Sequence, residues 1–144
     1  MRGYWNKPDA NASSFTADGY FLTGDIGRID ENGFLTIVDR KKDMIIVSGF
    51  NVFPNEIEAY ASSCPGVREC ACIGVPNERT GEAVRLYVVK TPGSSLKPFD
   101  VISHCRLGMT AYKIPKTVVF LDELPKSPVG KILRRELRKL ADLS

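Results

Sequence analysis

The stretch ECACIGVPNERTGEAVRLYVVK, residues 69–90, decides the fold class of this sequence. It predicts two strands, at 69–76 and 82–90, because apolar residues dominate both runs and a polar loop, NERTG, separates them. Cys70 and Cys72 stand two residues apart in the first run, so we expect them to face the same side of a sheet. The neighbouring elements are predicted outward from this pair of strands.

Segments on both sides of the pair predict a mixture of helices and strands. A helix is expected from Pro54, which suits a first helical turn, and it should end at Pro65-Gly66. Residues 98–109 have helical spacing, KTVVFLD (116–122) predicts a strand, and a last helix is expected from near Gly130. The predicted apolar positions of the first and last helices are Ile57, Tyr60, Ala61, Cys64, Leu133, Leu137 and Leu140. Because no regular βαβ repeat is present, the predicted class is α+β.

The N-terminal part predicts short strands and turns. Residues 1–17 indicate a loop with a short helical turn, and strands are expected at 19–24, 25–30 and 34–39. The Asn32-Gly33 pair between the last two runs is a strong hairpin signal. A second pair of short strands, MIIVSG and NVF, is expected around a turn at Ser48-Gly49.

Five consecutive charges, DRKKD at 39–43, interrupt this series of strands. Such a run makes a poor buried strand, so it predicts a linker. The first forty residues have little of their own to pack against, and we expect them to belong to a larger domain.

Composition sets limits on the function classes. The chain has 144 residues, of which 43% are hydrophobic and 26% charged, as is usual for a globular protein. No apolar run approaches the roughly 20 residues that span a bilayer, and the start MRGYWNKPDA lacks the apolar core of a signal peptide. We therefore expect a cytoplasmic protein, with peripheral association at the inner face of a membrane as the alternative.

The four cysteines do not predict a metal or redox site. Their spacing differs from C-x-x-C, and His104 is the single histidine of the sequence. We expect four reduced, mostly buried thiols and no metal ligands; the positions are Cys64, Cys70, Cys72 and Cys105.

Positive charge is concentrated at the C-terminal end. Residues 126–144 contain six basic and two acidic side chains, a net charge of +4, whereas the whole chain carries +3. Two hypotheses follow. Either the last helix belongs to a binding module for anionic ligands, nucleic acid or a membrane surface, or the charge serves one catalytic group. The helix lacks interleaved aromatic residues, which disfavours nucleic acid.

Three short motifs are candidate sites. An aspartate after Thr23-Gly24, Asp25, could accept hydrogen bonds from a ribose diol, although Gly-Asp also makes an ordinary turn. The Ser48-Gly49 turn, taken alone, is better explained by ordinary turn and cap chemistry than by a binding site. Lys131 could act as a point charge for phosphate or carboxylate oxygens, and its alternative is a solvated surface lysine.

Five stretches, in this order along the chain, resemble the adenylate-forming enzyme superfamily. They are GYWNKPDA, DGYFLTGD, GFLTIVDRKKDMIIVSGFNVFPNEIE, GVPN…GE and PKSPVGKILRREL. This superfamily includes acyl-CoA synthetases, luciferases and peptide-synthetase adenylation domains. The stretch DRKKDMIIVSGFNVFPNEIE is most similar to long-chain fatty acid–CoA ligases. The resemblance covers nearly the whole chain, but only the end of such an enzyme, since no Ser/Thr/Gly-rich phosphate loop is present in this sequence.

The resemblance implies a domain organisation. Residues 1–39 would be the tail of a large N-terminal domain, residues 40–42 a hinge, and residues 43–144 the small mobile C-terminal domain. The large domain, absent from this sequence, would be its main partner, and no nucleic acid is implied. Fatty acid, ATP and CoA would be the substrates, with acyl-CoA, AMP and pyrophosphate as products of a reaction through acyl-AMP. Mg²⁺ is expected in such an enzyme but without ligands from these residues.

The resemblance also implies roles for the residues before the small domain. Asp25 matches the aspartate that binds the ribose hydroxyls of ATP, and Arg40 matches an arginine that reaches nucleotide oxygens. Lys42 stands at the hinge position.

In the small domain, Ser48, Gly49 and Phe50 match the turn that lines the pantetheine tunnel during thioester formation. Lys131 matches the lysine that contacts the acyl carboxylate and the α-phosphate during adenylation. We expect Lys131 to open the last helix, whose N-terminus would add positive potential at the same place.

Overall fold

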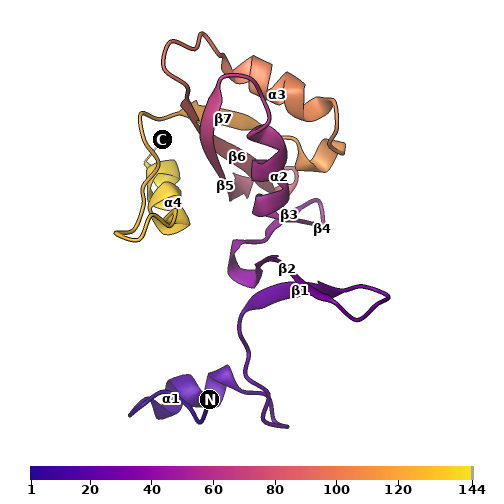
Figure 1. Cartoon of the computed structure of the whole chain (residues 1–144), viewed down its shortest axis with the longest axis vertical. Coiled ribbons are helices and arrows are strands. Elements are labelled where there is room, and N and C mark those ends of the chain that lie inside the picture. Colours follow the sequence, from indigo (N-terminus) through magenta and orange to yellow (C-terminus); the bar gives the residue numbers. More distant parts are fainter. Residues whose placement is uncertain (144) are drawn as a thin grey trace. The chain divides into compact units, whose positions relative to one another are not determined.

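A computed structural model describes residues 1–143, so that Ser144, the last residue of the expected small domain, lies outside the described residues (Figure 1). The chain divides into two compact units, Met1–Lys42 and Asp43–Ser144. Each unit has its own sheet.

The first unit contains a helix and a two-stranded antiparallel sheet. Helix α1 (Pro8–Ser14) has a proline in its first turn. Strands β1 (Asp25–Ile29) and β2 (Leu35–Arg40) pair around the predicted hairpin turn. The turn is held by the Asp30 carboxylate, which accepts the backbone N–H groups of Asn32 and Phe34, both at 2.9 Å. The hairpin prediction is confirmed.

The strand expected at 19–24 is wrong. An isolated bridge between Phe15 and Phe21 forms there, and strand β1 begins after it, at Asp25. The physical reason lies in two glycines with left-handed backbone, Gly19 at φ +87° and Gly24 at φ +74°, which turn the chain at both ends of the run.

The second unit is built on one five-stranded sheet with the strand order β4-β3-β6-β5. Strand β7 pairs in parallel with β6, and the other pairings are antiparallel. The predicted strands at 69–76 and 82–90 form the long central pair, in which Cys72 lies opposite Leu86. The strands are β3 (Ile45–Val47), β4 (Phe50–Val52), β5 (Val67–Asn77), β6 (Gly81–Lys90) and β7 (Thr117–Phe120).

Helices cover both faces of this sheet (Figure 1). Helices α2 (Pro54–Ala61) and α3 (Pro98–Arg106) pack over one face, where alternate strand residues such as Cys72 and Leu86 are fully buried. Helix α4 (Arg134–Asp142) covers the other face, where Leu137 packs with the buried Ile73 and Tyr87. Helices and strands are thus mixed without a βαβ repeat, and the predicted α+β class is confirmed.

The start of the last helix differs from the prediction. Helix α4 begins at Arg134 and not near Gly130, because Lys126 and Ile132 form a β-bridge that keeps the preceding residues extended. Its apolar face also differs, since Leu140 is 44% exposed. Ala141, one turn after Leu137, packs in its place.

The five-charge run is not an irregular linker throughout. Asp39 and Arg40 end strand β2, and residues Lys41–Asp43 form a short 3₁₀-helix, η1. The boundary between the two compact units falls inside this helix, between Lys42 and Asp43.

All four cysteines are buried and unpaired by disulfides, as predicted. Cys70 and Cys72 face the same side of the sheet. Burial, and secondarily the neighbouring Glu58 carboxylate, raises the pKa of the Cys70 thiol to about 12. Burial likewise raises the pKa of Cys105 to about 11. Among residues 1–143, no helix is both long and apolar enough to cross a membrane.

Candidate functional site

The residues predicted to bind nucleotide lie together in the first unit. A pocket of about 520 Å³ is lined by Thr23, Gly24, Arg40, Lys41 and Lys42. The backbone N–H of Lys41 donates to the Gly24 carbonyl at 2.8 Å, which holds the two sides of the pocket together.

Asp25 adjoins this pocket through an ion pair. Its Oδ1 accepts a 2.7 Å hydrogen bond from Nη1 of Arg40, and its backbone N–H donates to the Thr23 hydroxyl at 3.1 Å. A carboxylate beside several cationic side chains offers acceptors for hydroxyl groups and donors for anionic oxygens in one place. This arrangement suits a ligand that carries both a diol and phosphates.

The Ser48-Gly49 turn joins β3 to β4 in a tight hairpin. Both residues have left-handed backbone, with φ +52° at Ser48 and φ +82° at Gly49, as a two-residue type I′ turn requires. The Ser48 N–H donates to the Thr80 carbonyl at 2.8 Å, and the Ile46 N–H donates to the Glu82 carboxylate at 2.7 Å. A Cβ added at Gly49 would meet no atom within 4 Å. The turn is therefore supported from behind and open at its tip.

An aromatic pair stands beside this turn. The rings of Phe50 and Tyr112 stack with centroids 4.6 Å apart and planes inclined by 15°. Tyr112 belongs to the 3₁₀-helix η2 (Ala111–Lys113). A pocket of about 200 Å³ lies next to it, lined by Val47, Ser48, Thr80, Ala83, Val84, Ala111, Tyr112, Ile114 and Lys116. Sequence analysis missed Tyr112, because its partner lies 62 positions away in the chain.

Lys131 lies in a narrow loop and not at the start of a helix, so the expected support from a helix N-terminus directly behind it is wrong. The Ser127 N–H donates to the Lys131 carbonyl at 2.8 Å, and the Lys131 N–H donates to the Ser127 hydroxyl at 3.1 Å. Gly130 closes the turn with a 2.8 Å hydrogen bond to the Ser127 carbonyl and φ +77°. The loop is tied to β5 by the Lys126–Glu69 ion pair at 2.7 Å.

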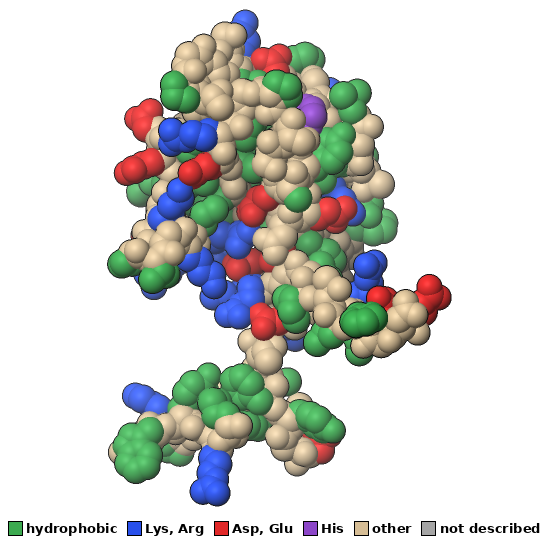
Figure 2. All heavy atoms as spheres, in the orientation of Figure 1, with side chains coloured by type: hydrophobic (Ala, Val, Ile, Leu, Met, Phe, Trp, Pro, Cys, Tyr) green, Lys and Arg blue, Asp and Glu red, His purple; other side chains and the backbone are tan. Residues whose placement is uncertain are grey.

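The basic residues of the C-terminal stretch differ in their pairing. Figure 2 shows Lys and Arg side chains lying among Asp and Glu side chains over the surface of the larger unit. Five of the six basic residues pair with a carboxylate: Lys126, Arg134, Arg135, Arg138 and Lys139. Within residues 1–143, the exposed Lys131 ammonium has no carboxylate partner. Its charge is thus available to an anion that comes from elsewhere.

Sequence analysis also missed a buried ionic network around Arg134. Its Nη2 donates to both carboxylate oxygens of Glu58 on α2, each at 2.8 Å. Its Nη1 lies 3.9 Å from the Asp43 carboxylate, which accepts a 2.7 Å hydrogen bond from Arg138. The acidic start of α2 and the paired arginines were visible in the sequence, but their pairing across 76 positions was not.

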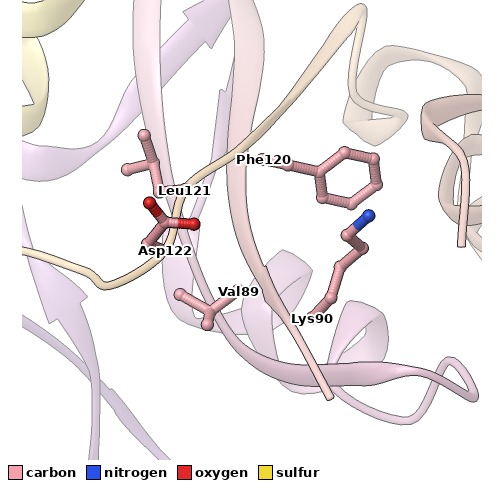
Figure 3. A pocket seen from close by; sticks show the side chains of 5 residues that line it. All are labelled: Val89, Lys90, Phe120, Leu121 and Asp122. Carbon is pink, nitrogen blue, oxygen red and sulfur yellow. The ribbon is translucent and has the colours of Figure 1, made fainter. Parts of the chain in front are cut away.

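Another pocket lies apart from all predicted site residues. It has a volume of about 310 Å³ and is lined by Val89, Lys90, Phe120, Leu121 and Asp122 (Figure 3). The Lys90 ammonium lies 4.7 Å from the centroid of the Phe120 ring, a cation–π contact. This contact explains the position of the Lys90 ammonium, so no bound ligand is needed to explain it.

The described residues do not offer a metal site. Across residues 1–143, no group of three or more His, Cys, Asp or Glu side chains is placed to hold a metal ion.

Comparisons with known proteins agree with this architecture. The family model for the AMP-binding enzyme C-terminal domain matches residues 56–131, more than half of the chain. The chain belongs to this family of small domains from adenylate-forming enzymes. The sequence resemblance and the α+β fold that it implied are both confirmed.

Individual relatives show which named enzymes the chain is similar to. Over 138 residues, the chain is 60% identical to a long-chain-fatty-acid–CoA ligase of Yersinia pestis and 57% identical to one of Escherichia coli O6:H1. Both alignments cover 96% of this chain but 24% of the relative, so the chain spans about a quarter of these proteins. The crystal structure of ATP-bound MatB from Rhodopseudomonas palustris matches with a TM-score of 0.91 and 41% identity, over 96% of this chain and 28% of that one.

Proposed function

We propose that this chain is the C-terminal portion of an AMP-forming long-chain fatty acid–CoA ligase. The parent enzyme would join a fatty acid to ATP, forming acyl-AMP and pyrophosphate, and CoA would then displace AMP to give acyl-CoA. The similarity to named ligases supports the class and the substrate. Because ATP and CoA are substrates, a cytoplasmic location is proposed with it, either free or peripheral to a membrane.

The observation that carries this proposal is the unpaired charge of Lys131. A hydrogen-bonded loop presents this ammonium at the surface, while the other five basic residues of the stretch are paired with carboxylates. In adenylation, a fatty acid carboxylate attacks the α-phosphate of ATP, and negative charge builds on the phosphate oxygens. A fixed cation that meets this charge stabilises the transition state without having to rearrange.

Residues of the first unit would hold the nucleotide. In this proposal Asp25 accepts hydrogen bonds from the ribose hydroxyls, and Arg40 reaches nucleotide oxygens from the same pocket. Residues 1–39 then belong to the large domain, 40–42 form the hinge at Lys42, and 43–144 form the mobile small domain. Rotation about the hinge would exchange the Lys131 loop for the Ser48-Gly49 turn at the reaction centre.

The Ser48-Gly49 turn would serve the second half-reaction. An open tip without a side chain at Gly49 allows a narrow pantetheine chain to pass close to the backbone. Phe50 would form part of the same wall. Mg²⁺ would accompany ATP in the parent enzyme, and its ligands would come from ATP and from residues outside this chain.

The alternative hypothesis, a stand-alone module that binds anionic surfaces through α4, finds less support. Such a module needs several free cations on one face. Here Arg134 pairs with the largely buried Glu58, Arg138 pairs with the buried Asp43, and Arg135 and Lys139 share Glu136.

The test is the activity of the full-length protein against fatty acids of increasing chain length, with ATP and CoA. We expect acyl-CoA and AMP to form with long-chain acids, whereas the 144-residue chain alone forms neither. Absence of AMP formation with every acid would refute the proposal. Preference for short or aromatic acids would retain the class but refute the substrate.

A further inference from the structure

Arg134 connects helix α4 to helix α2 around the end of the sheet. Its two 2.8 Å hydrogen bonds to Glu58 come from one guanidinium nitrogen, and the same nitrogen lies 3.1 Å from Oδ1 of Asn55. The side chains of Arg134 and Glu58 are only 17% and 16% exposed. A largely buried ion pair with several hydrogen bonds has a well-defined geometry, in contrast to a solvated surface pair.

Glu58 is itself fixed by the sheet. Its Oε1 accepts the backbone N–H of Cys72 at 2.8 Å, on strand β5 at the end of the strand order. A side chain that satisfies an edge-strand N–H also protects that edge from pairing elsewhere. The Arg134 guanidinium is therefore held in a fixed position relative to strand β5.

Arg134 is also the first residue after the loop that carries Lys131. The loop closes where the Leu133 N–H donates to the Pro125 carbonyl at 2.8 Å, next to Arg134. Arg134 stands three positions after Lys131, so a shift of the α4 start moves the ammonium with it.

The network continues to the residue after the proposed hinge. Asp43, whose side chain is 8% exposed, lies 3.9 Å from Arg134 and accepts a 2.7 Å hydrogen bond from Arg138 on the next turn of α4. Asp43 directly follows Lys42 in the chain. One set of ion pairs thus links the start of the small domain, helix α2 and the start of α4.

We propose that Arg134 is a positioning residue for adenylation: through Glu58 and Asp43 it fixes the Lys131 loop relative to helix α2 and the first residue of the second unit. This inference rests on the proposed function. Arg134 itself does not touch the reacting atoms, since its guanidinium is turned to Glu58, Asn55 and Asp43. Its effect on the reaction passes through Lys131, which distinguishes it from a residue that supports the fold in general.

The experiment uses the full-length enzyme and measures acyl-AMP formation by pyrophosphate release in variants Arg134→Gln, Lys131→Ala and the double variant. Misplacement of a catalytic group by about 1 Å can cost about 10²-fold in rate, so we expect a loss of that order in kcat for Arg134→Gln with KM for ATP unchanged. In the double variant the rate should equal that of Lys131→Ala alone, because the group being positioned is gone. The matched control is Arg135→Gln. The Arg135 side chain is 79% exposed, so this substitution should leave the rate of acyl-AMP formation unchanged in both backgrounds.

The proposal would be overturned if Arg134→Gln lowered the rate as much in the Lys131→Ala background as in the wild-type background. Arg134 would then act independently of Lys131. If Arg134→Gln does not fold, the same comparison is made with Arg134→Lys, which keeps the charge but lacks the second guanidinium nitrogen that faces Asp43 while the first binds Glu58. A wild-type enzyme that forms no acyl-AMP would refute the proposed function itself, an outcome distinct from independent effects in an active enzyme.

Discussion

The hydroxyl of Tyr87, on the central strand β6, donates a 3.2 Å hydrogen bond to the backbone carbonyl of Leu137 in the middle of α4. The Leu137 side chain is fully buried in the same contact region, and Tyr87 is 2% exposed. Helix α4 is therefore attached to the sheet by backbone and side chain at one point. The position of the whole C-terminal stretch depends on this attachment.

Leu137→Ala should destabilise the second unit by about 2–5 kcal/mol, because it removes a fully buried leucine and leaves a cavity under α4. Urea unfolding of the 144-residue chain, followed by circular dichroism, measures the change. The control is Leu140→Ala on the same helix, where the side chain is 44% exposed and we expect a cost below about 1 kcal/mol. Equal losses for the two variants would mean that α4 is not anchored through Leu137.

These two leucines show what the sequence could and could not predict about the fold. The spacing of Leu133, Leu137 and Leu140 predicted a helix, which is confirmed, but of these three only Leu137 is a buried position within it. The helix start was wrong, because a hydroxyl-to-backbone contact between Ser127 and Lys131 keeps the preceding segment out of the helix. Propensity alone does not include such a contact.

The candidate sites were also only partly predictable from the sequence. The Ser48-Gly49 turn was predictable because a two-residue hairpin needs left-handed backbone, and small residues between strands indicate it. The Arg134–Glu58 pair was not, since it depends on how α2 and α4 meet around the end of the sheet. Local chemistry was therefore accessible from the sequence, and long-range pairing was not.

Substitutions at Gly49 should separate backbone strain from function. With φ +82° and open space where a Cβ would stand, Gly49→Val should cost roughly 1–2 kcal/mol through strain alone, and Gly49→Asn should cost less because asparagine tolerates this region. If the turn contacts pantetheine, Gly49→Asn in the full-length enzyme should still slow thioester formation from acyl-AMP. Timed assays that start from synthetic acyl-AMP and CoA measure the rate of thioester formation.

Gly33 supplies the matched control for this prediction. It stands in the β1–β2 hairpin with φ +85° and likewise has no atom within 4 Å of an added Cβ. Gly33→Asn should therefore carry a similar strain without slowing thioester formation. A rate unchanged by Gly49→Asn, or lowered equally by Gly33→Asn, would remove the support for a tunnel role.

The buried thiols predict a loss of stability at high pH. The pKa of Cys70 is raised from 9.0 to about 12, mainly by burial, so the folded state holds a proton that the unfolded chain releases at lower pH. This contribution is fully present below about pH 9 and is lost as the pH rises towards 12. We expect the free energy of unfolding to fall more steeply with pH above 9 in the wild type than in Cys70→Ala. The urea midpoint at several pH values measures it, and identical slopes would contradict the shift.

Lys131→Ala in the full-length enzyme is the sharpest test of the two proposed half-reactions. The ammonium would act on charge that develops only in the transition state of adenylation, so its removal should lower kcat and leave substrate binding nearly unchanged. Loss of one preorganised electrostatic group typically costs about 10²–10³ in rate. Pyrophosphate release with saturating ATP and fatty acid measures the adenylation step. The comparison variant is Lys126→Ala, which removes a lysine of the same stretch that is paired with a carboxylate.

The second half-reaction decides what the loss means. If rotation at the hinge replaces the Lys131 loop by the Ser48-Gly49 turn, the Lys131→Ala enzyme should convert synthetic acyl-AMP and CoA to acyl-CoA at nearly the wild-type rate. A parallel loss in both steps would mean that Lys131 is needed in both arrangements or supports the loop, and the two-arrangement mechanism would be wrong. If neither step changes, the charge that stays unpaired in the Ser127–Lys131 loop is that of an ordinary solvated lysine.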